Sequence, residues 1–228
     1  CVCVCVCVCV CFENMSMNED HLRKAWEVGH RSTKDDWREW LRNLKIVLLR
    51  ESPSPALRSC APLAHAYNPI ARELFCPAFL SCWAHLSPPY KEMLMRNLER
   101  AVSQDWSPNM PHEVLHMLLT LAEFMEHHNS QLPINRKLLI SAADRCHAFA
   151  KSLHYMELEF RSFGGGERAE KERAVEPLMS LYQSLSLPHA SNGLLVYANK
   201  DLKLELRESW YEMLRMWGDA LAAYKRRE

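Results

Sequence analysis

Residues 31–50 read RSTKDDWREWLRNLKIVLLR, and this stretch decides the fold class. Ser32 and Thr33 each precede an acidic residue by three positions, which is the capping-box pattern of a helix N-terminus. The apolar side chains that follow recur at helical spacing on one face: Trp37, Trp40, Leu41, Leu44, Val47 and Leu48. Charged residues lie largely outside that stripe, so the segment predicts an amphipathic helix that packs on a neighbour.

The same pattern recurs along the chain and is punctuated by proline. Three dipeptides each combine a capping residue with a proline that opens a helix: Ser54-Pro55, Asn68-Pro69 and Ser87-Pro88. Further apolar stripes cover residues 90–102, 114–125 and 138–153, with short links between them. This rhythm is typical of antiparallel helix pairs in helical repeats. We therefore predict an all-α fold, an α-solenoid of antiparallel helix pairs that is tetratricopeptide-like in its last part.

The last part of the chain carries the tetratricopeptide-like pattern. Two helix pairs are predicted there: residues 174–185 with 190–199, and residues 203–215 with 218–226. In the second pair, Trp210 and Tyr211 precede a small residue at the turn and alanines where the helices approach each other. We expect Gly218 and Ala220 to be small for a packing reason, because bulk there would push the pair apart. The glycines at 164–166 predict a flexible joint, and the charged run at 167–176 predicts a solvated helix face or a linker.

The first eleven residues alternate Cys and Val without exception. Soft-metal binding is one interpretation, since Cys-x-Cys places thiolates close together, and an aggregation-prone strand is another. A TG dinucleotide repeat translated in frame gives the same alternation, and we favour this compositional origin. Residues 1–16 are therefore treated as a low-complexity tract that does not fold.

Composition excludes several classes of function. Lys and Arg together number 28, as do Asp and Glu, so the chain lacks the basic excess of a nucleic-acid-binding protein. No apolar run approaches the roughly 20 residues of a membrane span, so we expect no direct membrane insertion and a cytoplasmic location. Four irregularly spaced cysteines favour buried free thiols: Cys60, Cys76, Cys82 and Cys146. A start at Cys1 rather than Met is expected of a fragment.

The sharpest candidate for chemistry is His112-Glu113-Val114-Leu115-His116, which matches the H-E-x-x-H motif of zinc peptidases. Pro111 places the first histidine at the start of a helix rather than in its middle. Leu119 and Ala122 stand where the metzincin continuation needs Gly and a third His. We interpret the motif as a plain helix start, and His127-His128 as a helix C-terminus that suits the dipole.

No kinase glycine loop, catalytic-loop His-Arg-Asp or Asp-Phe-Gly occurs in the sequence. Aromatic residues at helical spacing indicate core packing rather than a ligand cage. We predict no catalytic, cofactor-binding or metal-binding residues in this chain.

Several stretches resemble, in the same order, the target of rapamycin kinase family. They are 35–41 (DDWREWL), 54–60 (SPALRSC), 66–75 (AYNPIARELF), 78–83 (AFLSCW), 121–127 (LAEFMEH), 148–160 (AFAKSLHYMELEF), 210–212 (WYE) and 219–224 (DALAAY). The segment from Ala66 to Trp83 is the most specific of them. Two departures from the family are Pro62 and Pro77, each of which is expected to kink or break a helix.

The resemblance implies a fragment at the junction of HEAT-type repeats and a FAT domain. Residues 31–135 would be the HEAT-like repeats, and residues 136–228 the N-terminal part of the FAT domain. It also implies a parent serine/threonine-protein kinase that uses ATP and magnesium. The parent would couple nutrient and growth signals to translation and autophagy, partly at lysosomal or other endomembranes.

Two functions follow as hypotheses. The first is a non-catalytic scaffold segment of such a kinase, whose partners are its own kinase domain and the subunits of its complex. The second is a stand-alone tetratricopeptide-like adaptor without a kinase domain. A zinc peptidase is a third interpretation, which needs bound zinc and a distal ligand.

Overall fold

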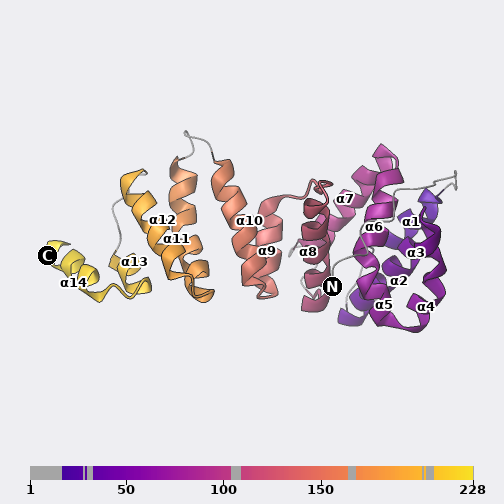
Figure 1. Cartoon of the computed structure of the whole chain (residues 1–228), viewed down its shortest axis with the longest axis horizontal. Coiled ribbons are helices and arrows are strands. Elements are labelled where there is room, and N and C mark those ends of the chain that lie inside the picture. The colour runs from indigo at the N-terminus through magenta and orange to yellow at the C-terminus, as the bar shows by residue number, and fades with distance from the viewer. Residues whose placement is uncertain are drawn as a thin grey trace. The chain divides into compact units, whose positions relative to one another are not determined.

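The computed structural model describes residues 17–27, 29, 33–103, 109–163, 168–201, 203 and 208–227 (Figure 1). Over these residues the chain forms fourteen α-helices and no strand, which confirms the predicted all-α fold of helix pairs. The Cys-Val tract, Ser32 and the glycine joint at 164–166 lie outside the described residues. None of the helices in the described part has the length and apolar character that a membrane span requires.

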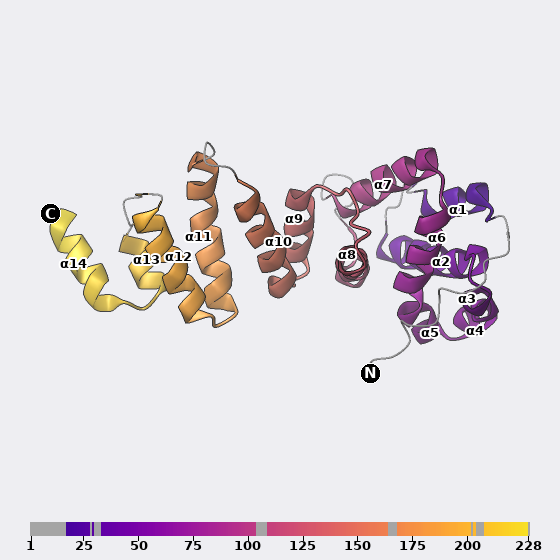
Figure 2. The same ribbon diagram turned by 45° about the horizontal axis from the view of Figure 1, so that its top comes forward.

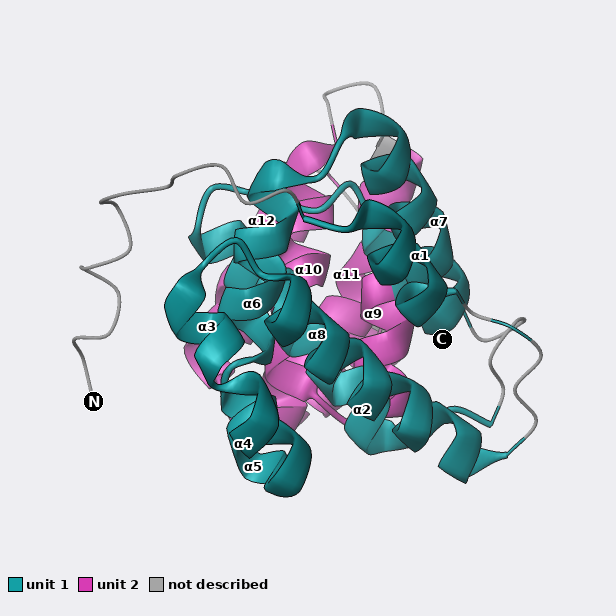
Figure 3. Ribbon diagram, turned by 90° about the vertical axis from the view of Figure 1, so that its right-hand side faces the viewer, with its two compact units in different colours: residues 1–138 teal, residues 139–228 magenta. Residues whose placement is uncertain are grey.

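Two compact units divide the chain, residues 1–138 and residues 139–228 (Figure 3). Each unit is described by itself below. The division rests on compactness and does not test the assignment of residues 31–135 to HEAT-like repeats or of residues 136–228 to a FAT domain. That assignment stays a prediction.

Unit 1 is built around a long central helix, α2. Its helices are α1 (Glu19–Trp26), α2 (Lys34–Glu51), α3 (Pro55–Ser59), α4 (Ala61–Ala66), α5 (Asn68–Glu73), α6 (Phe75–His85), α7 (Pro88–Val102) and α8 (His112–His127). Contacts join α2 to α1, α3, α4, α5, α6 and α8. One helix therefore supplies the surface against which most of the unit packs.

The start of α2 is fixed by the predicted capping box. The Thr33 Oγ1 atom accepts a hydrogen bond from the Asp36 backbone N–H at 3.2 Å, and the Thr33 N–H donates to the Asp36 carboxylate at 2.9 Å. All six apolar residues of the predicted stripe are buried, and Trp37 and Trp40 pack edge to face with their ring centroids 5.6 Å apart. Ile46, Leu49 and Lys45 are buried as well, so the buried surface is wider than a single amphipathic stripe.

Helix breaks surround the two prolines that depart from the family. Pro62 lies at the second position of α4, directly after a break at Cys60, and Pro77 lies in the first turn of α6. A proline in the first turn costs little, because its missing N–H would have no intrahelical acceptor there. The expected break occurs in both places. Asn68 was predicted to cap its helix, but Tyr67 holds the cap position and Asn68 is the first helical residue.

Helix α1 was not predicted from the sequence. Asn18 caps it by accepting a hydrogen bond from the His21 N–H, and Leu22 and Trp26 are fully buried. The Glu19 carboxylate accepts bonds from the Ser87 N–H at 2.7 Å and the Ser87 Oγ at 3.1 Å. Ser87, expected to cap α7 with its own side chain, instead joins α7 to α1.

Unit 2 consists of successive helix hairpins. Its helices are α9 (Arg136–Arg145), which begins just before the unit boundary, α10 (Phe149–Ser162), α11 (Arg168–Ser184), α12 (Pro188–Lys200), α13 (Glu208–Met213) and α14 (Trp217–Arg227). Helices α10, α11 and α12 lie side by side in both views (Figures 1 and 2). Most of the charged run at 167–176 is the N-terminal half of α11, as the helix interpretation predicted.

In unit 2, three links of the same construction each connect the two helices of a pair: α9 with α10, α11 with α12, and α13 with α14. Each has three residues and a middle residue with positive φ: His147 at 55°, Ser186 at 56° and Arg215 at 56°. In each, the N–H after the middle residue donates to a carbonyl five residues earlier, as Leu187 N does to Tyr182 O at 2.8 Å. This is the Schellman arrangement that ends a helix and reverses the chain. The spacing of the three links brackets the roughly 34-residue period of tetratricopeptide repeats.

The packing reason given for Gly218 is wrong. A Cβ atom added at Gly218 would meet no other atom within 4 Å, so nothing in the described residues requires a glycine there. Ala220 is 4% exposed, which fits a close approach of α13 and α14. Trp217 is 66% exposed, although the aromatic residues were expected in the core, whereas Trp210 is buried.

Replacing Phe79 by alanine tests the core of unit 1. Phe79 is 1% exposed and stacks on Trp83, with ring centroids 6.0 Å apart. We expect Phe79→Ala to lower the free energy of unfolding by about 3–5 kcal/mol, because the ring leaves a cavity. Leu63→Ala is the control, since Leu63 is 59% exposed, and it should change stability by less than about 0.5 kcal/mol. Equal denaturation midpoints for the two variants would contradict this core.

Candidate functional site

The H-E-x-x-H motif occupies the first turns of α8. Pro111 holds the cap position and His112 is the first helical residue, as the plain helix start predicted. The Glu113 carboxylate lies 3.5 Å from the Arg38 guanidinium, and all three polar side chains of the motif are exposed. Among the described residues, no group of three His, Cys, Asp or Glu could hold a metal ion. The prediction that the chain binds no metal remains untested.

The second histidine candidate packs on its own helix. The His128 ring Nδ1 lies 2.8 Å from the Phe124 carbonyl oxygen, and the ring stacks on Phe124 with centroids 4.1 Å apart. His128 is the C-cap residue of α8, and Asn129 after it has a φ of 53°. The pair therefore ends a helix, as interpreted from the sequence.

The cysteines outside the N-terminal tract are free thiols, as predicted. Cys76 and Cys82 are buried, whereas Cys60 and Cys146 are partly exposed. Burial raises the pKa of the Cys82 thiol to about 12, with a smaller contribution from Glu51, and the thiol donates to the Leu48 carbonyl. A thiol with so high a pKa is not a nucleophile near neutral pH.

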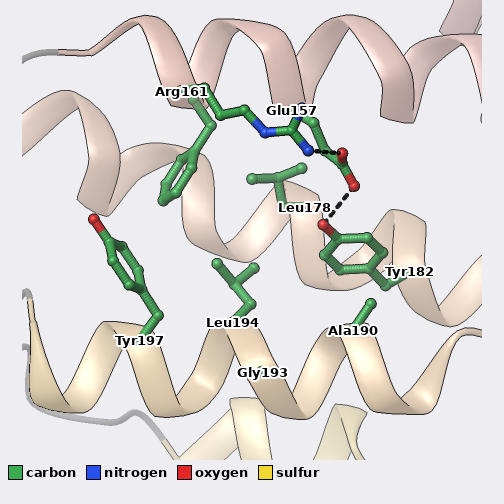
Figure 4. A pocket seen from close by; sticks show the side chains of 9 residues that line it. Glu157, Arg161, Leu178, Tyr182, Ala190, Gly193, Leu194 and Tyr197 are labelled. Atoms are coloured by element: carbon green, nitrogen blue, oxygen red, sulfur yellow. Dashed lines mark hydrogen bonds and ion pairs between the residues drawn. The ribbon is translucent and has the colours of Figure 1, made fainter.

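A shallow groove in unit 2 is lined mostly by apolar and aromatic side chains (Figure 4). It has a volume of about 260 Å³ and lies between α10, α11 and α12. Its lining combines apolar and aromatic side chains with one acid and one base: Glu157, Phe160, Arg161, Leu178, Tyr182, Ala190, Gly193, Leu194 and Tyr197. Pockets that bind ligands commonly have this mixture of a mostly apolar wall and a few polar groups.

Glu157 organises the polar end of this groove. Its two carboxylate oxygens accept hydrogen bonds from the Tyr182 hydroxyl at 2.7 Å and from the Arg161 guanidinium at 2.8 Å (Figure 4). Burial raises the pKa of Tyr182 to about 12, and the hydrogen bond to Glu157 adds to the rise. Tyr182 therefore stays a neutral donor across the physiological range and holds α11 to α10.

At the other end of the groove, Phe160 and Tyr197 pack edge to face with centroids 5.9 Å apart. Gly193 faces open space, because a Cβ atom added there would meet nothing within 4 Å. The groove can accept an apolar side chain between its aromatic walls and offer hydrogen bonds from its polar end. None of its lining residues forms a nucleophile and base pair, so the site suits binding rather than catalysis.

Sequence reasoning missed this groove although it found most of the helices. Glu157 and Arg161 are spaced as an i, i+4 ion pair, which signals a solvated face rather than a site. Tyr182 comes from another helix, α11, and a third helix, α12, supplies the remaining lining residues of the groove. A local pattern carries no information about which helix lies opposite.

The antiparallel helix hairpins of this chain and the mostly apolar groove between them are features of a helical-repeat protein. No family model matches the chain. Its relatives are kinases: the serine/threonine-protein kinase TOR of Arabidopsis thaliana is 48% identical over 216 residues. The serine/threonine-protein kinase TOR2 of Saccharomyces cerevisiae is 44% identical over 214 residues, and the target of rapamycin homolog of Caenorhabditis elegans is 32% identical over 221.

The chain belongs to the family of target of rapamycin serine/threonine-protein kinases. These alignments cover 92% of this chain for the Arabidopsis relative, 94% for the yeast relative and 93% for the nematode relative. The chain spans only 8% of the length of each of the three relatives. The resemblance inferred from its motifs is confirmed.

The contribution of the Tyr182–Glu157 hydrogen bond to the free energy of unfolding should depend on pH. We expect Tyr182→Phe to lower the free energy of unfolding by about 1 kcal/mol at pH 8. The folded-state pKa is raised from 10.0 to about 12, so the contribution is complete below about pH 10 and is lost as the pH rises through 12. The difference between wild type and variant should therefore shrink over that window in denaturant titrations.

Tyr67→Phe serves as the matched control, because Tyr67 is 60% exposed. It should leave the free energy of unfolding unchanged at pH 8. A Tyr182→Phe difference that stays constant from pH 8 to pH 12 would show that the hydroxyl does not donate to Glu157.

Proposed function

We infer that the chain is a non-catalytic helical scaffold segment of a target of rapamycin-type serine/threonine-protein kinase. The similarity to such kinases carries this inference, at 41–48% identity over 92–94% of the chain. The segment has the fold of a helical scaffold, and its sequence lacks the kinase motifs. A parent kinase that couples nutrient and growth signals to translation and autophagy is the function that the resemblance favours.

The scaffold works through the shape of its helix pairs. In each unit the helices bury apolar stripes against one another and leave polar faces and grooves for other proteins. Protein partners, namely the kinase domain of the same polypeptide and subunits of its complex, fit surfaces of this kind. The parent would act in the cytoplasm, held peripherally at lysosomal or other endomembranes, without nucleic acid and without insertion of this segment into a bilayer.

ATP and Mg²⁺ belong to the kinase domain of the parent in this proposal. The described residues do not fit Mg²⁺, because among them no group of three His, Cys, Asp or Glu side chains could hold a metal ion. The sequence also lacks a glycine loop to cover phosphates. This segment therefore contributes position and contact surface, and none of its residues takes a step in phosphoryl transfer.

The stand-alone adaptor is the second candidate, and the groove beside Glu157 is the observation that favours it. Adaptors built from tetratricopeptide-like hairpins bind partner segments in such grooves. Sequencing the full-length transcript separates the two functions. A kinase domain encoded downstream on the same message supports the scaffold, whereas a stop codon shortly after Glu228 supports the adaptor.

A segment exchange in yeast tests the scaffold directly. The aligned segment of the yeast TOR2 protein is replaced by this chain, and the endogenous gene is switched off. We expect the chimera to sustain growth, because the two segments are 44% identical and protein cores tolerate substitutions that keep the total volume and the apolar pattern. Growth rate and the steady-state level of the chimera are measured together.

Two variants of the chimera control for folding. Ala71→Arg places a charge at a position that is 0% exposed, so it should abolish growth and reduce the protein level. Leu63→Ala, at an exposed position, should behave like the parent chimera. A chimera that accumulates normally and yet fails to sustain growth would refute the proposed role.

A further inference from the structure

Lys45 is a buried lysine without a counter-ion. It lies in the middle of α2, and its residue is only 6% exposed. Within the described residues its ammonium group makes no hydrogen bond and no ion pair. Lysines are almost never so buried unless they are paired. The Nζ atom is not among the fully buried polar atoms without a partner in the described residues, so the ammonium group is accessible from the cavity that it lines.

The side chain lines a polar cavity of about 400 Å³ between α2, α5 and α8. Arg42 lies one turn before Lys45 on the same face of α2, and Arg72 reaches the cavity from α5. Both arginines are exposed, so they stand nearer the solvent than the buried lysine. The three cations line one half-open cavity from two helices.

Acidic side chains also line the cavity, but two of them are already engaged. Asp35 and Glu113 both lie against the Arg38 guanidinium, at 2.8 Å and 3.5 Å. These two contacts raise the pKa of Arg38, with the Asp35 hydrogen bond contributing most. Glu39 is the third carboxylate in the lining of the cavity, together with Arg42, Lys45 and Arg72.

The surroundings of Lys45 disfavour its positive charge. Burial lowers its pKa, the nearby positive charge of Arg72 lowers it further, and Cys76 opposes the shift. The positive charges of Lys45 and Arg72 repel each other, and an anion between them would relieve the repulsion and replace part of the hydration that Lys45 loses on burial.

We propose that this cavity binds a small phosphate-bearing anion, held by Lys45 at its base and by Arg42 and Arg72 at its mouth. Guanidinium groups bind phosphate oxygens in pairs, and a lysine adds a point charge. Leu41, Val114 and Met117 supply an apolar wall, and the volume lies in the range of small-molecule sites. The inference does not depend on the proposed function.

A small solute fits better than a membrane or a phosphorylated protein. The decisive cation is recessed, whereas Asp35, Glu39 and Glu113 are exposed around it. Those carboxylates would repel the extended negative surface of a lipid headgroup layer. They leave an isolated phosphate free to enter the recess and contact Lys45.

Titration calorimetry of the 228-residue chain with inorganic pyrophosphate tests the proposal. We expect one site per chain. Lys45→Met should weaken binding by about tenfold or more, and Arg72→Gln by several-fold, because each removes a charge-assisted contact. Arg50→Gln removes one positive charge from an exposed position of the same helix, and should leave the affinity within about twofold.

Glu39→Gln should change the affinity for pyrophosphate in the opposite direction. Removing this negative charge from the lining of the cavity should tighten pyrophosphate binding, which a purely structural role of this surface would not produce. Lys45→Met should also raise the denaturation midpoint of the free chain, because the buried unpaired charge is gone. Weaker binding in a more stable variant cannot arise from unfolding.

Two further arms identify the source of the phosphate. Phosphatidylcholine vesicles containing phosphatidic acid, and a phosphoserine peptide, should bind more weakly than pyrophosphate. Vesicle or peptide binding that is lost in Lys45→Met while pyrophosphate does not bind would overturn the small-solute assignment. Absence of pyrophosphate binding, or equal losses in Lys45→Met and Arg50→Gln, would overturn the site itself.

Discussion

Burial of α2 is the constraint on which unit 1 depends. This helix packs against six others, and its two tryptophans, Trp37 and Trp40, are each 2% exposed. A helix surrounded in this way needs a fixed starting point, because a shift of one residue turns every side chain by about 100°. The Thr33–Asp36 capping box supplies that point by bonding both backbone donors at the N-terminus. The prolines then divide the following chain into short helices that fit around the central one.

Sequence patterns were sufficient where the cause is local. The capping box, the proline-led helix starts and the buried stripes depend on neighbours within one or two turns, so they could be predicted. Helix α1 also carries local signals, an Asn18 cap and Leu22 and Trp26 at helical spacing, but it has only eight residues and directly follows the low-complexity tract, so its pattern is short. The expected first helix of the last pair, residues 203–215, is described only as Glu208–Met213.

The features that could not be predicted from the sequence are those that depend on contacts between helices distant in the chain. Lys45 looks like an ordinary polar residue beside an apolar stripe, and only α5 and α8 enclose it. Tyr182 donates to Glu157 across 25 residues, which no periodicity indicates. Gly218 shows the opposite case. Its small size predicted a close approach between helices, but a Cβ atom added there would meet no other atom within 4 Å. Whether one face of a helix is buried depends on which other helix packs against it. The residue pattern of the first helix does not identify that second helix.

The three similar links of unit 2 make this region tolerant of residue substitutions and sensitive to insertions and deletions. Histidine, serine and arginine occupy the same left-handed backbone position, so the reversal is produced by main-chain hydrogen bonds rather than by a particular side chain. Exchange of residues at these corners therefore leaves the path of the chain intact. Insertions or deletions there would change where the next helix begins, and related sequences should accordingly drift in composition at the corners while keeping their length.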